Sequence, residues 1–184
     1  MKHGKLIVIS GPAGVGKSTV TRQAVARTGV LLSVSATTRP PRPGEADGRE
    51  YHFMDRAAFD NLVAADGFLE YADVFGQRYG TPAAPVRRAL EAGRTMVLEI
   101  DVQGGMQVAK KMPEAMFVLI VPPSDEELRR RLVGRGTETP DQLARRLGKA
   151  SEELALARGS GVYTIEVVND DLERAIDEVC RLIG

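Results

Sequence analysis

The residues most suited to chemistry in this sequence lie in a short glycine-rich stretch near the N-terminus. Residues 11–19 read GPAGVGKST and directly follow the apolar run LIVIS (6–10). They fit the pattern G-x-x-x-x-G-K-[ST], whose glycines let successive backbone N–H groups turn toward one anion at a helix N-terminus. In this pattern the lysine contacts the β- and γ-phosphates and the hydroxyl binds Mg²⁺. The stretch therefore predicts a nucleoside triphosphate site.

This loop does not identify the reaction, because kinases, GTPases and motor ATPases all use it. A glycine turn with a chance lysine is disfavoured, since a strand pattern precedes the loop and the helical pattern KSTVTRQAVAR follows it. We expect the triphosphate to contact the whole loop, with Lys17 also acting in catalysis: Gly11, Pro12, Ala13, Gly14, Val15, Gly16, Lys17, Ser18 and Thr19.

Two carboxylates end a second apolar run, TMVLEID (95–101). Glu99 and Asp101 are two residues apart, so they point to the same side of an extended strand. They also lie at the carboxyl end of that strand, where α/β folds bind ligands. Either could join Ser18 at Mg²⁺ through water, or contact the phosphate acceptor. Alternatively, Asp101 only caps the helix expected from residue 102.

The stretch TTRPPRPGEADGREYHF (37–53) combines proline, glycine and charge. Its prolines and glycines exclude a helix. The sequence leaves two interpretations open: a solvated linker, or a stiff loop whose arginines hold a ligand. Within it, Glu45, Asp47 and Arg49 are expected to pair with one another or with water.

Short apolar runs alternate with helical patterns along the chain. This order predicts an α/β fold with a central parallel sheet and helices on both faces. The expected strands are 6–10, 31–35, 95–100, 116–121 and 164–168. The expected helices are 17–28, 82–92, 102–111, 124–134, 139–157 and 171–182.

Two segments interrupt this alternation. We expect residues 36–81 to form a small inserted α+β lobe, and residues 125–157, rich in Arg and Glu, to form a helical lid. The remaining ranges, 1–35, 82–124 and 158–184, would form the core of one domain spanning 1–184. A length of 184 residues suits one domain that buries roughly 70% of its unfolded surface.

Composition bounds the partners and the compartment. Lys plus Arg and Asp plus Glu both total 25, so no net charge attracts nucleic acid or an anionic membrane. The single cysteine, Cys180, excludes an internal disulfide, and no apolar run approaches the roughly 20 residues that span a bilayer. We therefore expect a cytoplasmic protein with neither a nucleic acid nor a membrane as partner.

Taken together, several blocks make the chain similar to a guanylate kinase. Besides the phosphate loop they are SVSATTRPPRPGEADGREYHF, FLEYADVFGQRYGTP, LEIDVQG, GRGTET with a following ARRL, and VVNDDLERA. They span nearly the whole chain in the order of that family. The resemblance implies transfer of the ATP γ-phosphate, with Mg²⁺, to GMP and to dGMP, giving ADP and GDP in purine nucleotide metabolism and GMP recycling.

The resemblance also implies a role for matching residues. Arg39, Arg42, Tyr51 and Tyr79 would hold the GMP phosphate, since guanidinium forks and phenol hydroxyls suit a dianion. Glu70 would read guanine N1–H and the 2-amino group, because a carboxylate only accepts hydrogen bonds. The remaining base contacts would come from Ser35, Thr81 and Asp101.

On the ATP side, the resemblance implies that Arg135 and Arg146 reach the phosphates from the lid and that Asn169 lies beside the adenine. The segment GSGVYTIEVVND (159–170) is richer in glycine than the family pattern. The sequence therefore does not determine the path of the chain from the lid back to the core.

Two rival functions remain at this point. One is a guanylate-kinase-like module that binds without efficient catalysis, although such modules typically lose the phosphate loop that is intact here. The other is a related kinase for a ribose bisphosphate, which would have no guanine to read. The sequence does not determine the oligomeric state.

Overall fold

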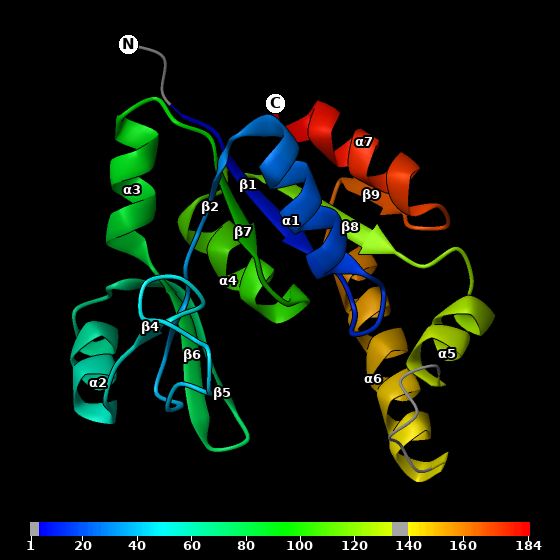
Figure 1. Ribbon diagram of the computed structural model, residues 1–184, viewed down its shortest axis with the longest axis horizontal. Coiled ribbons are helices and arrows are strands. Elements are labelled where there is room, and N and C mark those ends of the chain that lie inside the picture. The colour runs from blue at the N-terminus through cyan, green and yellow to red at the C-terminus, as the bar shows by residue number, and fades with distance from the viewer. Residues whose placement is uncertain (1–3, 134–139) are drawn as a thin grey trace.

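The computed structural model describes residues 4–133 and 140–184, and its centre is a parallel sheet (Figure 1). The strand order in this sheet is β2-β7-β1-β8-β9, and every neighbouring pair is parallel. Its strands are β1 (Leu6–Ser10), β2 (Leu31–Leu32), β7 (Met96–Glu99), β8 (Met116–Val121) and β9 (Ile165–Val168). The predicted α/β fold with a central parallel sheet is confirmed.

Apolar residues cover both faces of this sheet because its strands are apolar at nearly every position. Ile7 and Ile9 point to one face, and Leu6 and Val8 to the other. The first face packs on α1 (Lys17–Thr28) and α7 (Leu172–Ile183). The second packs on α3 (Ala83–Glu91), α4 (Val102–Lys111) and the end of the long helix α6 (Pro140–Gly159). Burial of each such side chain stabilises the fold by about 1.5–3 kcal/mol.

A second, smaller sheet stands beside the first, with the order β4-β3-β6-β5. Its strands are β3 (Ala36–Thr37), β4 (His52–Phe53), β5 (Phe68–Val74) and β6 (Gln77–Pro82). Helix α2 (Arg56–Ala64) covers it, and Phe59 from this helix stacks on Phe68 with ring centroids 4.4 Å apart. The segment predicted to be an inserted lobe therefore has a hydrophobic core of its own.

The strand predicted over residues 31–35 is too long. In the structure β2 contains only Leu31 and Leu32, and Ser33 adds one further bond, from its N–H to the carbonyl of Val97 (2.9 Å). The chain then leaves the central sheet, and Ala36 enters the second sheet. The sequence pattern of residues 31–35 does not reveal this change of sheet, because the chain is extended both before and after it.

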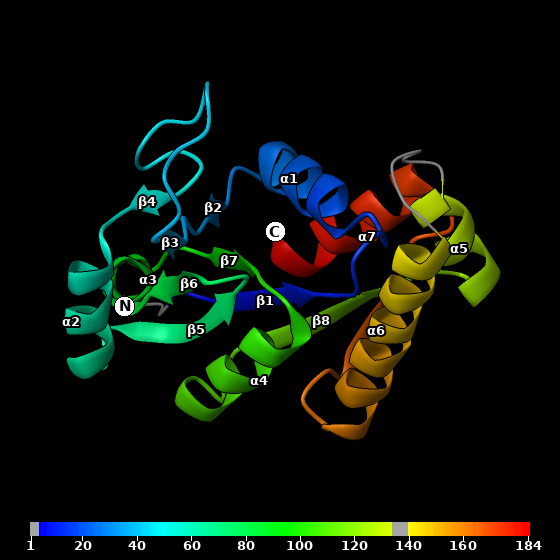
Figure 2. The same ribbon diagram turned by 90° about the horizontal axis from the view of Figure 1, so that it is seen from below.

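Helices α5 (Asp125–Val133) and α6 pack on each other through Leu128, Leu132 and Ala150. Figure 2 shows this pair on the opposite side of the central sheet from the second sheet. The glycine-rich return from α6 is fixed by Tyr163, whose buried hydroxyl donates to Ser10 Oγ (2.9 Å). Within the described part of the chain, no helix combines the length and apolar character needed to cross a bilayer.

Candidate active site

The phosphate loop connects β1 to α1, and its shape depends on Gly16. This residue is the N-cap of α1 with φ 89°, in the left-handed region that favours glycine. A Cβ at Gly16 would also lie 2.5 Å from Asn169 Nδ2, so a larger residue would have to displace the Asn169 amide. The backbone N–H of Val20 donates to the carbonyl of Gly16 (3.1 Å), which starts the helix directly behind the loop.

Lys17 is held at the carboxyl end of β7. Its ammonium donates to the carbonyl of Ile100 (2.9 Å). Burial lowers the pKa of Lys17 below its ordinary value, and the nearby carboxylates of Glu99, Asp101 and Glu153 oppose this effect. The lysine is therefore a partly desolvated cation within the loop, where it can neutralise an anion strongly.

Ser18 and Glu99 provide oxygen atoms suited to a hard cation. The Ser18 hydroxyl donates to the Glu99 carboxylate across the mouth of the loop. No cluster of three metal-ligating side chains occurs among residues 4–133 and 140–184. Mg²⁺ commonly takes one or two protein oxygens and completes its shell with phosphate and water, so these residues fit Mg²⁺.

The loop lines a cavity of about 410 Å³. All predicted loop residues except the buried Val15 line it, together with Glu99 and Asp101. Lys149 and Glu153 enter the same cavity from α6, one turn apart. Burial raises the pKa of Glu153, and Lys149 opposes this shift. Helix α6 thus brings one positive and one negative side chain to the phosphate loop.

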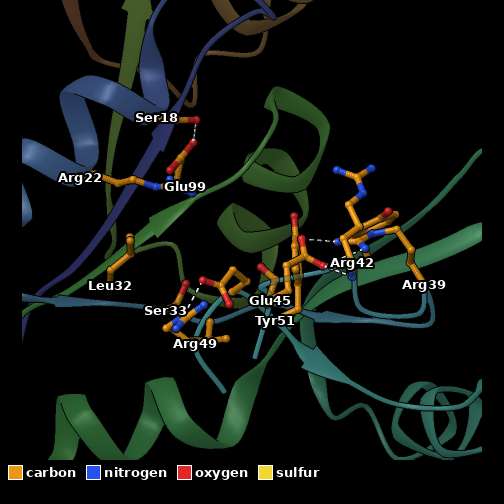
Figure 3. Close-up of a pocket in the computed structure, with 14 residues that line it drawn as sticks. Ser18, Arg22, Leu32, Ser33, Arg39, Arg42, Glu45, Arg49, Tyr51 and Glu99 are labelled. Atoms are coloured by element: carbon orange, nitrogen blue, oxygen red, sulfur yellow. Dashed lines mark hydrogen bonds and ion pairs between the residues drawn. The ribbon is translucent and has the colours of Figure 1, made fainter. Parts of the chain in front are cut away.

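A second cavity, of about 580 Å³, lies between the phosphate loop and the second sheet (Figure 3). Ser18 and Glu99 line both cavities, so the two spaces meet at these residues. The lining residues are Ser18, Arg22, Leu32, Ser33, Val34, Ser35, Arg39, Arg42, Glu45, Arg49, Glu50, Tyr51, Tyr79 and Glu99. Of the predicted GMP-binding residues, Ser35, both arginines and both tyrosines are brought together here.

The Arg39 guanidinium is held in a fixed orientation by Glu45. Its two terminal nitrogens donate to the two carboxylate oxygens of Glu45, both at 2.9 Å, and the backbone N–H of Arg42 donates to the same carboxylate (2.7 Å). The hydrogen bonds from Arg39 and Arg42 lower the pKa of Glu45. The expectation that Glu45, Asp47 and Arg49 pair with one another is wrong, since Glu45 pairs with Arg39, Arg49 pairs with Glu50, and Asp47 accepts from the backbone of Phe53.

Two tyrosines complete this end of the cavity. The rings of Tyr51 and Tyr79 meet edge to face with centroids 5.8 Å apart, and the Arg39 guanidinium carbon lies 5.5 Å from the centre of the Tyr51 ring. Burial raises the pKa of Tyr51, so its hydroxyl stays protonated and can donate at neutral pH. Cationic forks beside phenol donors can bind an anion of the phosphate type.

Glu70, Thr81 and Asp101 lie near one another but do not line the larger cavity. Glu70 is only 8% exposed and accepts a hydrogen bond from the Thr81 hydroxyl (2.6 Å). Burial raises the pKa of Glu70; the Thr81 hydrogen bond lowers it, and the charge of Asp101 raises it further. Asp101 also caps α4 by accepting from the N–H of Gly104 (2.7 Å), so the capping alternative is correct in part.

The residues predicted to contact ATP from outside the phosphate loop are Arg146, Asn169 and Arg135. Arg146 is exposed on α6, on the same helix face as Lys149 and Glu153, and it does not line either cavity. Asn169 is buried, and its side-chain amide donates to the carbonyl of Val15 (2.8 Å). Arg135 lies outside the described residues.

The comparisons with known proteins agree with this geometry. The sequence model of the guanylate kinase family matches residues 3–184. The chain belongs to the guanylate kinase family. It is 48% identical over 181 residues to a guanylate kinase of Thermus thermophilus, covering 98% of this chain and 81% of the relative. A guanylate kinase of Thermobifida fusca is 51% identical over 181 residues, with 98% and 91% covered. The crystal structure of guanylate kinase from Anaplasma phagocytophilum superimposes with a TM-score of 0.73 at 31% identity, covering 99% of this chain and 85% of that one.

In this guanylate kinase the structure adds residues that sequence reasoning missed. Glu45 was named in the sequence analysis, but its pairing with Arg39, six residues earlier in the proline-rich loop, was missed. Lys149 and Glu153 follow Arg146 at helical spacing, so they share its face. Arg22 extends from α1 toward Glu99 (Figure 3). The one sequence signal for this was that Arg22 lies one helical turn after Ser18, on the same face of the helix.

Proposed function

We propose that this guanylate kinase places ATP on the phosphate loop and GMP in the larger cavity, so that the γ-phosphoryl group passes between them near Ser18 and Glu99. The observation that carries this proposal is the meeting of the two cavities at these two residues. One cavity has a phosphate-binding loop, and the other has arginines and tyrosines. Two phosphate groups bound in them would therefore approach each other.

The GMP site would divide into a phosphate end and a base end. Arg39, Arg42, Tyr51 and Tyr79 would hold the phosphate dianion with charge-assisted hydrogen bonds. Glu70 would accept from guanine N1–H and the 2-amino group, helped by Ser35, Thr81 and Asp101. A buried carboxylate facing adenine would lose these partners, which explains why GMP and dGMP would be preferred to AMP.

Catalysis would consist mainly of positioning and charge neutralisation. The nucleophile is a phosphate oxygen of GMP that is already ionised at neutral pH, so no general base is required. Lys17 would neutralise charge on the transferred group, and Arg135 and Arg146 would approach it from the lid. Mg²⁺ would be held by Ser18, with Glu99 or Asp101 through water, and when bound it would supply charge neutralisation on the phosphate oxygens.

Closure would exclude water from the reaction. We propose that the segment 36–81 acts as a GMP-binding lobe and 125–157 as a lid over ATP, whose adenine would lie near Asn169. An open site would hydrolyse ATP, so both segments would close before transfer. The single cysteine, Cys180, is consistent with a cytoplasmic location.

The proposal is tested by measuring ADP release from Mg·ATP with GMP or a ribose bisphosphate as acceptor. Turnover with GMP and none with the ribose bisphosphate is expected. Turnover with the ribose bisphosphate would favour the related kinase. Tight GMP binding without ADP release would indicate a binding module.

A further inference from the structure

Asn169 has a position that the reaction scheme does not explain. It follows β9, and its backbone N–H donates to the carbonyl of Val121 (2.9 Å), which fixes it at the end of β8. Its side chain is buried beneath the phosphate loop, where Nδ2 donates to the carbonyl of Val15 (2.8 Å). The residue expected beside adenine is therefore bonded to the backbone of the loop.

The bond acts on one peptide unit of the loop. In a trans peptide the carbonyl and the following N–H point in opposite directions, and the described residues contain no cis peptide. Holding the Val15 carbonyl toward Asn169 therefore turns the N–H of Gly16 away from Asn169. The same amide nitrogen would lie 2.5 Å from a Cβ at Gly16, so the Asn169 side chain packs closely against this residue.

A second contact reaches the same carbonyl from the lid. Arg131 on α5 directs one guanidinium nitrogen to the Val15 carbonyl (3.4 Å) while its Nε donates to Glu127 (2.7 Å). This contact is longer than that from Asn169 and lies near the limit for a hydrogen bond. Asn169 therefore contributes the stronger constraint on the Val15–Gly16 peptide.

We propose that Asn169 is a positioning residue of the phosphate loop, which orients the Gly16 N–H toward the phosphate groups whatever base the nucleotide carries. The inference rests on the proposed use of the loop for nucleotide phosphates. It predicts that loss of the Asn169 amide weakens binding of a triphosphate without a base as much as binding of ATP.

The test compares Asn169→Leu, which keeps the side-chain volume, and Asn169→Ala with the matched control Asn61→Ala on the exposed face of α2. Calorimetry would measure affinities for Mg·ATP, magnesium tripolyphosphate and GMP. Both triphosphates are expected to bind about 3- to 10-fold more weakly to the Asn169 variants, by the same factor, with GMP affinity unchanged. The control should match the parent protein.

Three results would overturn the inference: a loss confined to ATP, which would mean a contact to adenine; no loss for either triphosphate; or an equal loss for GMP, which would mean general destabilisation. If both variants fail to fold, the unaltered protein still decides. Its Gly16 amide proton should shift downfield in NMR spectra when tripolyphosphate binds, and an unmoved signal would contradict the proposal. None of these measurements requires GMP phosphorylation, so failure of the proposed function would be seen separately.

Discussion

Glu70→Gln is the substitution that most sharply separates guanine recognition from the rest of the reaction. The glutamine is nearly the same size as the glutamate, so the packing around this buried side chain should persist. It replaces one of two acceptor oxygens with an NH₂ group. Guanine presents two donors, so one of the two expected hydrogen bonds would become an unfavourable contact between donors.

The size of the effect follows from this count. A hydrogen bond to a charged group contributes about 1.5–3 kcal/mol, and each 1.4 kcal/mol corresponds to a factor of ten. The value of kcat/KM for GMP is therefore expected to fall about 10- to 150-fold. Turnover of AMP should not fall, because adenine has no donor at N1, so the preference for GMP should decrease by the same factor.

Stability provides an internal check on this variant. Burial raises the pKa of Glu70, so its ionised form costs folding free energy as pH rises through that raised pKa. Glutamine removes this cost, and Glu70→Gln is expected to be no less stable than the parent at pH 7. In the parent, kcat/KM for GMP should decline in acid at a pH above the ordinary pKa of glutamate, as the carboxylate becomes protonated.

The assay is ADP release at saturating Mg·ATP over a series of GMP concentrations, combined with thermal unfolding. Glu91→Gln, at the exposed end of α3, serves as the control for loss of a carboxylate outside the site. Unchanged GMP kinetics in Glu70→Gln would refute the assignment of Glu70 as the base reader. A clearly lower melting temperature of Glu70→Gln at pH 7 would also contradict the reasoning, because the loss of activity could then reflect unfolding.

Three further predictions concern the phosphates. Lys17→Met is expected to lower kcat about 10²- to 10³-fold. Burial lowers the pKa of Lys17, so the charged lysine costs folding free energy at pH 7. The melting temperature of Lys17→Met should therefore equal or exceed that of the parent at pH 7, and the difference should shrink as pH approaches 10.5. A clearly lower melting temperature of the variant at pH 7 would contradict this expectation. Arg39→Lys should raise KM for GMP about tenfold, with KM for ATP unchanged, because an ammonium lacks the five fixed donors that let Arg39 hold Glu45 and still donate to a phosphate. Steady-state kinetics would detect an equal rise in both, which would count against the assignment. Removing Mg²⁺ with EDTA should stop ADP release while GMP still binds in calorimetry, and transfer that survives EDTA would exclude the proposed metal role.

The elements that the sequence predicts well depend on local patterns. The run LIVIS is apolar at nearly every position and is a buried strand. The helix from Lys17 begins directly after Gly16, which is its N-cap. The change of sheet after Ser33 could not be predicted, because it depends on which strands are available to pair with residues 31–37 in each sheet. That information lies in β7 and β6, far along the chain.

The candidate site shows the same division. The loop residues could be predicted because spacing alone specifies the backbone turn. The Arg39–Glu45 pair could not, since the six-residue separation lies in a loop whose path is set by prolines and by contacts with the second sheet. The direction of Lys149 and Glu153 likewise depends on how α6 packs on α5, through Leu147 and Ala150.

The most direct test of the central claim is a comparison of GMP and AMP as phosphate acceptors in the unaltered protein. With Mg·ATP saturating, kcat/KM for each would be obtained from the rate of ADP release. A site that reads guanine through Glu70 predicts a ratio of roughly 10⁴ or more in favour of GMP. Comparable values for the two acceptors would contradict the assignment.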